Sequence, residues 1–194
     1  MSDKIIFIEK PDEVSWESIH QVLWEAHEST RKNGLFYPTS EMTGNELNQF
    51  LYEHNGRCFV AMDGDNVVGT MSCYIEDIKT RLFSGKFLKI VLVGNKPKYK
   101  RRGIFSKLYD ICYNYAKSEG LDGITYGTAE RNYTMRKIFK SKGFISNRCH
   151  YNKDKQRFIV GGIYCFKKPP YRKEYYALIF KIKQLIEHLR HLVS

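Results

Sequence analysis

The residues best placed to do chemistry form a basic segment in the middle of the chain, from Lys96 to Lys107. The segment holds six lysines and arginines in twelve residues, and no acid. An apolar run over 87–93 precedes it, and apolar residues at a helical period follow from Ile104, so we expect a turn from a strand into a helix. Free N–H groups and the positive dipole end of that helix, beside Gly103 and flanking cations, predict a phosphate-binding site.

The net charge of +11 is unevenly divided along the chain. Residues 1–78 carry 5 Lys/Arg and 14 Asp/Glu, whereas residues 79–194 carry 27 Lys/Arg and 7 Asp/Glu. A basic half suggests nucleic acid, an anionic membrane or a phosphate-rich cofactor as partner, with a solvated basic surface as the alternative. Nucleic-acid-binding surfaces more often spread cations along a face and interleave aromatic residues, which makes nucleic acid the less favoured partner.

Composition and cysteine usage exclude several classes of protein. A chain of 194 residues is the length of about one domain, and 42% apolar with 27% charged residues argues against a disordered chain and against a membrane bundle. The N-terminal apolar run is too short for a signal peptide. The five cysteines include no C-x-x-C pair, and the histidines have no metal-ligand spacing, so we expect no disulfide framework, no metal and a cytoplasmic location.

The pattern of apolar residues and turns predicts a mixed α/β protein, with a central sheet of about six or seven strands flanked by helices. A Lys-Lys-Pro-Pro break at 167–170 separates an added C-terminal amphipathic helix, which gives expected domains of 1–166 and 171–194. The expected strands lie at 4–9, 57–62, 67–75, 82–93, 122–128, 144–151 and 157–166, and the expected helices at 14–30, 43–53, 102–119 and 132–142.

This order of elements, and the stretch from Leu88 to Phe144 in particular, resembles the GNAT superfamily of acyl-CoA-dependent N-acetyltransferases. The family's signature after its fourth strand, Gln/Arg-x-x-Gly-x-Gly/Ala, is matched by Lys100-Arg101-Arg102-Gly103-Ile104-Phe105. Its later signature is an Asn, an aromatic residue seven positions on, and Gly-Phe, matched here by Asn132, Phe139 and Gly143-Phe144. The resemblance implies a GNAT-like acyltransferase domain over 1–166 that moves an acetyl group from acetyl-CoA, as co-substrate, to a primary amine.

The resemblance also implies where coenzyme A binds. The N–H groups of 101–106 would hold the pyrophosphate, and the cations around them the remaining phosphate. Backbone groups near Val93 to Asn95 would bond the pantetheine arm and polarise the thioester carbonyl. Asn132 would contact the arm as well, which is compatible with a plain helix cap. The implied cofactor-binding residues are Val93, Asn95, Lys100, Arg101, Arg102, Gly103, Ile104, Phe105, Ser106 and Asn132.

Two residues depart from the family pattern. Phe105 stands where Gly or Ala is usual, so its side chain must point away from the cofactor or the loop must differ in shape. Phe139 stands where many members have a tyrosine that protonates the leaving thiolate, and phenylalanine cannot donate a proton. The thiolate must then receive its proton from water, another residue or the product amine.

An amine acceptor needs deprotonation before it attacks the thioester, so a carboxylate or a water relay is expected. Glu130, just beyond the strand 122–128, is the first candidate, with an ion pair to Arg131 or a helix-dipole role as its alternative. Glu76 and Asp77 come second. Tyr126 could act as acid or orienter, or could pack in the sheet. The region of the first two helices is acidic, and it could attract a cationic amine or could be a solvated face. Its acids are Glu25, Glu28, Glu41, Glu46 and Glu53.

The C-terminal helix carries an apolar stripe that must find a surface. Its members, spaced 3, 4, 3, 4 and 3 residues apart, are Tyr175, Leu178, Ile182, Leu185, Leu189 and Leu192. The first expectation is that the stripe packs on the protein's own sheet or helices. The alternatives are the same helix of a second subunit, in a homodimer, and an anionic membrane surface.

Two rival functions stay open at this point. Phe139 favours a non-catalytic acyl-CoA-binding or regulatory protein of the same fold. The basic half of the chain favours a nucleic-acid-binding module.

Overall fold

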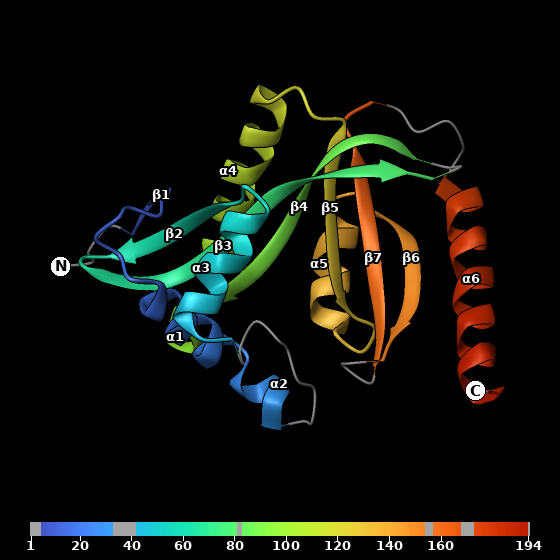
Figure 1. The fold of residues 1–194 in the computed structure, drawn as a ribbon, viewed down its shortest axis with the longest axis horizontal. Helices are drawn as coiled ribbons and strands as arrows, with labels where there is room; N and C mark the ends of the chain where they lie inside the picture. The colour runs from blue at the N-terminus through green and yellow to red at the C-terminus, as the bar shows by residue number, and fades with distance from the viewer. Residues whose placement is uncertain (1–4, 33–41, 81–82, 154–156, 168–172, 194) are drawn as a thin grey trace. The chain divides into compact units, whose positions relative to one another are not determined.

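The computed structural model describes residues 5–32, 42–80, 83–153, 157–167 and 173–193. Figure 1 shows the elements in chain order from blue to red. The strands are β1 (Ile6–Glu9), β2 (Arg57–Asp63), β3 (Asn66–Lys79), β4 (Ser84–Asn95), β5 (Gly123–Ala129), β6 (Ile145–Asn152) and β7 (Arg157–Cys165). The helices are α1 (Trp16–Ala26), α2 (Glu28–Lys32), α3 (Gly44–Glu53), the 3₁₀ turn η2 (Pro97–Tyr99), α4 (Ile104–Ser118), α5 (Tyr133–Ser141) and α6 (Lys173–Val193).

The seven strands form one sheet in the order β1-β2-β3-β4-β5-β7-β6. The pairs β1/β2, β2/β3, β5/β7 and β6/β7 are antiparallel. The chain divides into two compact units, 1–75 with 90–119 and 76–89 with 120–194. β3 and β4 run from one unit into the other, and each unit has its own buried cluster.

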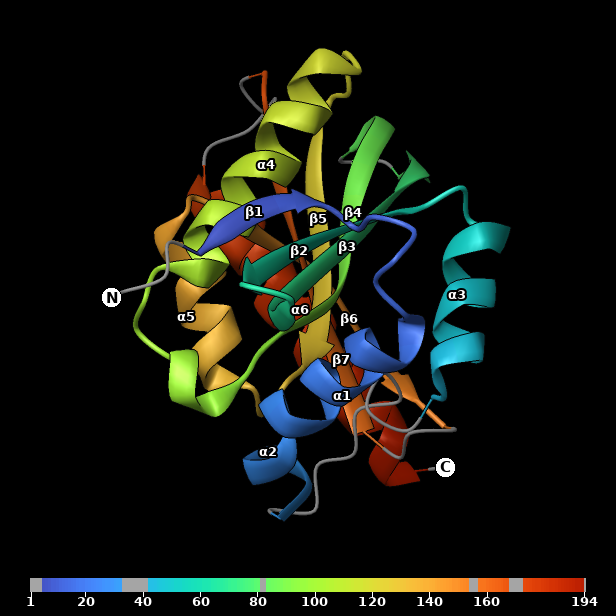
Figure 2. The same cartoon turned by 90° about the vertical axis from the view of Figure 1, so that its left-hand side faces the viewer.

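Helices cover both faces of the strands in the first unit. Neighbouring residues of a strand point to opposite faces, so their contacts show what covers each face. Val60 of β2 packs in a cluster with residues of α1 and α3, and its neighbour Phe59 meets Tyr115 of α4 at 6.3 Å between ring centroids. α1 packs against α3, and α4 against β2 (Figure 2). Ser15 caps α1, and Thr43 with Glu46 forms a capping box at the start of α3.

In the second unit, α5 and α6 cover opposite faces of β5 and β7. Phe139 of α5 stacks on Tyr126, whose ring centroid is 3.9 Å away. The adjacent residue pair, Thr125 and Ile163, points to the other face, where Ile163 shares a cluster with Tyr176 of α6. Figure 1 shows α6 running alongside β6, which it contacts.

The predicted fold is confirmed, with a seven-stranded sheet flanked by helices and an added C-terminal helix. The expected helix 14–30 is interrupted at His27, which ends α1, so α2 is a separate short helix. The domain boundary at 166/171 stays a prediction. Within the described ranges, no helix has both the length and the apolar character needed to cross a bilayer.

Candidate active site

The turn that leads into α4 has a left-handed backbone at two positions. Arg101 has φ +63° and Gly103 has φ +75°, and a Cβ added to Gly103 would meet no atom within 4 Å. The backbone bond from Lys107 N to Gly103 O, at 3.1 Å, closes the first turn of α4, and Gly103 provides no side-chain cap. The N–H groups of 104–106 come before that bond, so they point out of the helix end as anion donors.

Two contacts fix this turn to the first unit. The Tyr99 hydroxyl donates to the Asp63 carboxylate at 2.6 Å, and this bond raises the pKa of Tyr99, which therefore stays protonated as the donor. Ile104 is buried so closely against Gly69 that a Cβ added to Gly69 would lie 2.6 Å from its Cγ2. The backbone is thereby held in place while Arg101 and Arg102 stay exposed.

Phe105 does not obstruct the turn. Its ring stacks on Tyr109, one helical turn further along α4, with 6.3 Å between centroids and 14° between planes. The side chain therefore lies along the helix, and that it points away from coenzyme A stays a prediction.

The end of β4 carries features that the sequence analysis missed. Leu92 is buried with φ +49°, a conformation that is rare outside glycine and kinks the strand just before Val93. The His27 Nε2–H donates to the Val93 carbonyl at 3.1 Å. Burial lowers the pKa of His27 more than this bond raises it, so the ring is neutral at pH 7. A Cβ on Gly94 would meet Ala26 at 2.9 Å, so α1 presses directly on this end of β4.

Asn132, in the second unit, caps α5. Its Oδ1 accepts from Met135 N at 3.2 Å, and its Nδ2 donates to Thr128 Oγ1 at 3.0 Å. The cap role is therefore confirmed, and the contact with the pantetheine arm stays a prediction.

Tyr126 lies in an aromatic cluster rather than at the surface. It is 4% exposed, with Phe139 stacked on its ring and Phe144 meeting it edge-on. Burial raises the pKa of Tyr126. The alternative that this residue packs in the sheet fits its position, and Phe139, 1% exposed, forms part of the same core.

Glu130, the first candidate base, is engaged by α6. Its carboxylate accepts hydrogen bonds from Gln184 and from His188 Nε2, the latter at 3.1 Å. Cys149 lies close by, and the donor atoms of Glu130, Cys149 and His188 are within 4.8 Å of one another. Burial and the carboxylates of Glu130 and Glu187 raise the pKa of Cys149 to about 11, so a metal ion bound there would first have to displace the thiol proton. The expectation of no metal stays a prediction.

Glu76, the second candidate, lines a cavity of about 350 Å³ in the second unit. Its carboxylate accepts from Lys89 Nζ at 2.9 Å and from Thr125 Oγ1 at 2.5 Å. Burial opposes its charge, but these two bonds and the charges of Lys89 and Arg148 together hold the pKa of Glu76 below its ordinary value. The cavity is also lined by Asp77, Ile78, Lys79, Thr80, Phe83, Thr125, Asn147, Arg148, Cys149, Gly162 and Lys183.

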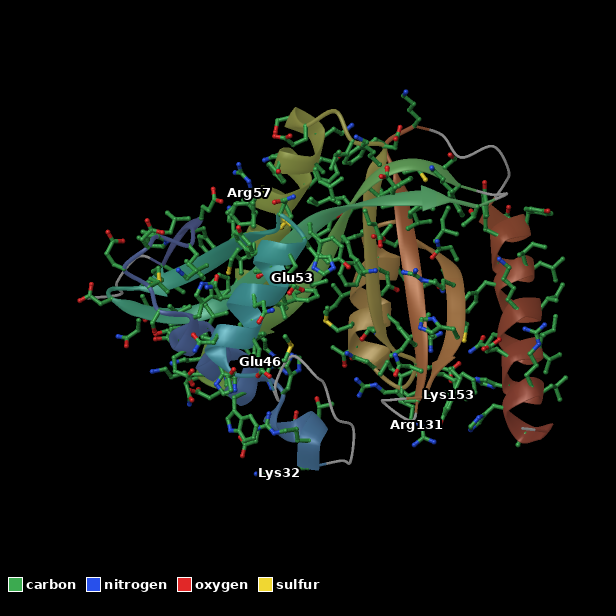
Figure 3. The ribbon with its side chains drawn as sticks, in the orientation of Figure 1. Lys32, Glu46, Glu53, Arg57, Arg131 and Lys153 are labelled. Carbon is green, nitrogen blue, oxygen red and sulfur yellow. The ribbon has the colours of Figure 1, made fainter. Side chains whose placement is uncertain are left out.

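The acidic side chains of the first helices have local partners. Glu28 pairs with Lys32 at 2.8 Å, and Glu25 lies 3.6 Å from Lys96. Glu46 and Glu53 both extend from α3 (Figure 3), where Glu46 completes the capping box and Glu53 accepts from Gln49. Glu41 lies outside the described residues. These contacts favour the solvated-face interpretation over an amine-binding wall.

Comparison with known proteins gives the family of the chain. A model described as the acetyltransferase (GNAT) family matches residues 16–144. N-alpha-acetyltransferase 30 of Xenopus laevis and that of Homo sapiens are each 28% identical over 100 residues, or 51% of this chain. That stretch is 35% and 26% of the two relatives, so the chain spans about a third of their length or less.

Solved structures share the fold at low identity. A chain of the NatC complex bound to Gag peptide and CoA has a TM-score of 0.64 and 14% identity, over 84% of this chain and 99% of that one. Ard1 from Thermoplasma volcanium has a TM-score of 0.62 and 16% identity, over 84% of this chain and 99% of that one. A Bacillus subtilis acetyltransferase in complex with CoA has a TM-score of 0.58 and 15% identity, over 84% of this chain and 100% of that one. The family model covers well over half of the chain, so the chain belongs to the GNAT family.

The hydrogen-bonded Glu76 carboxylate predicts a pH-dependent contribution to stability. Because its folded pKa is below the ordinary 4.5, its stabilisation is complete above that value and is lost as the pH falls through the folded pKa. Glu76→Gln removes the negative charge that pairs with Lys89, whose side chain is 19% exposed, and we expect a loss of about 1–3 kcal/mol at pH 7. Urea unfolding of both proteins between neutral and acidic pH measures the difference.

The control is Glu53→Gln on the exposed side of α3, which we expect to change stability little at any pH. If the difference between Glu76→Gln and the original protein stayed constant down to acidic pH, the assigned protonation of Glu76 would be wrong.

Proposed function

We propose that the protein transfers an acetyl group from acetyl-CoA to a primary amine. The turn from β4 into α4 is the observation that carries this proposal. Its open N–H groups, its unfilled space beside Gly103 and its exposed arginines suit a pyrophosphate and a further phosphate. Membership of the GNAT family and the CoA named in related structures support the same ligand.

The kink at Leu92 provides a place for the thioester. A left-handed residue interrupts the regular pairing of a strand, so backbone groups on either side of it can turn to a ligand. We propose that N–H groups between Val93 and Asn95 bond the pantetheine arm and the thioester carbonyl. Such a donor to a developing oxyanion contributes about 2.7–4 kcal/mol. His27, bonded to the Val93 carbonyl, would hold this segment in position.

The reaction needs an acid–base path in addition to binding. The amine nitrogen attacks the carbonyl carbon, the C–S bond breaks as the amide forms, and the proton lost by nitrogen must reach a base. Of the two candidates, we propose Glu76, because it lines the cavity and is ionised, so that it attracts a protonated amine. Glu130, whose carboxylate is bonded to α6, is the alternative.

Phe139 decides how the thiolate is protonated. Phenylalanine has no acidic proton to give, and the ring of Phe139 is buried against Tyr126 and Phe144. We propose that the protonated amine gives one proton to Glu76 before it attacks, and that the second proton, released as the amide forms, passes to the thiolate directly or through water. Slow thiolate release would suit the rival function, a binding protein that does not turn over.

Peptide α-amines belong among the acceptors to test, because the curated relatives are N-alpha-acetyltransferases.

Charge reversal in the turn tests the coenzyme A site. Arg102→Glu with Gly103→Asp places two carboxylates where phosphates would lie, and coenzyme A affinity should fall at least about a hundredfold, since hydrogen bonds to charged groups contribute roughly 1.5–3 kcal/mol each. Titration calorimetry with coenzyme A measures this affinity in each variant. The control, Lys117→Glu with Ser118→Asp, makes the same change in charge at the exposed far end of α4. Equal affinity in the two double variants would contradict the assignment.

A comparison of two single variants tests the base. With saturating acetyl-CoA and an amine that is turned over, Glu76→Gln should lower kcat/KM by about 10²–10⁴, the usual range for a general base. Glu130→Gln should have a small effect, as a loss of contacts to α6. Both variants should bind coenzyme A as the original protein does. A large loss in Glu130→Gln alone would transfer the role to Glu130.

A further inference from the structure

α6 turns a continuous apolar surface to solvent. We define its exposed stripe as Leu178, Ile182, Leu185, Ile186, Leu189 and Leu192, whose exposed fractions run from 43% for Ile186 to 79% for Leu192. They include most of the residues that the sequence analysis expected to pack on the protein's own sheet or helices. That expectation is wrong for the stripe, although the helix itself does lie against β6.

The opposite face of α6 makes the contacts with the sheet. Tyr176 and Phe180 are buried, and Tyr176 stacks on Phe83 at 5.0 Å. Further along the helix, His188 bonds Glu130, and the His191 ring stacks on Tyr151 at 3.8 Å. Successive residues of a helix turn by about 100°. Contacts spread along the whole helix therefore fix its rotation, with the exposed stripe facing away from the sheet.

The charges beside the exposed stripe all have one sign over most of its length. Lys181 flanks it on one side, and Lys183 and Arg190 on the other, and all three are exposed. The acids of α6 are Glu174, in the first turn, and Glu187, which accepts from Tyr151 N on the sheet side and lies 3.7 Å from Arg190. Two copies packed stripe to stripe would bring cations together with few acids to pair them, the opposite of the complementary flanks of helix dimers.

We propose that α6 binds an anionic lipid surface, lying in its plane with the exposed stripe inserted and the flanking cations at the headgroups. A large apolar face bordered by Lys and Arg is the pattern of interfacial helices. With 21 residues, α6 is about 31 Å long, so the stripe presents several turns to one plane. The charge of the helix flanks selects anionic over neutral lipid, and it selects a bilayer over a second copy.

Flotation with lipid vesicles tests the proposal on the full chain. The protein should float with vesicles of phosphatidylcholine and phosphatidylglycerol, and not with phosphatidylcholine alone, and high salt should weaken the binding. Leu185→Asn with Leu189→Asn should abolish flotation without unfolding the protein, because both side chains are exposed. Lys181→Gln with Lys183→Gln should weaken the lipid affinity about 25-fold, at about fivefold per cation.

The matched control is Lys140→Gln with Lys153→Gln, two exposed cations on α5 and after β6. It should bind vesicles as the original protein does. No flotation with anionic vesicles, or flotation that is equal in the leucine variant, would overturn the proposal. A dimer by light scattering that the leucine variant converts to a monomer, with no lipid binding by either, would assign the exposed stripe to a second copy instead.

Discussion

The left-handed turn between β4 and α4 is the constraint on which the proposed chemistry depends. A helix that begins with a capping side chain, as α3 does, has its first N–H groups occupied. α4 begins after Gly103 without one, and the Tyr99–Asp63 bond and the close fit of Ile104 against Gly69 hold the turn in that shape. The N–H donors at the start of α4 are thus kept available to a ligand by contacts between residues far apart in the sequence.

In the second unit, a half-buried ion pair holds Glu76, the carboxylate that we propose as the base. Glu76 and Lys89 come from the segments of β3 and β4 that belong to this unit, and Thr125 from β5 adds a third hydrogen-bonding group. A carboxylate of this kind costs desolvation energy that bonds must offset. Keeping it ionised beside a cavity suits an amine, which arrives as a cation and must lose a proton before it attacks.

The sequence predicted the elements well where periodicity and turn residues are strong, and it predicted the turn from a strand into a helix over 96–107 because an apolar run gives way there to a basic segment. Phosphate binding by this turn stays a prediction. Other features depend on contacts that no local pattern encodes. Leu92 has no sequence signal for its left-handed backbone, and the bond from His27 joins residues far apart in the chain. The sequence offered Arg131 as the alternative partner of Glu130, whereas its hydrogen-bond partners on α6 follow more than fifty residues later. The amphipathic pattern of α6 located its apolar stripe but not which face meets the sheet.

Acetyl transfer itself is the most direct measurement of the central claim. The protein is incubated with acetyl-CoA carrying an isotopic label in the acetyl group, together with a panel of small amines, amino sugars and peptides. Mass spectrometry identifies the acetylated product, and thiol release is followed in parallel. The account predicts that thiol release depends on one class of primary amine and yields a labelled amide in equal amount. Tight binding of acetyl-CoA with no labelled amide from any amine would contradict it and favour a binding protein of the same fold.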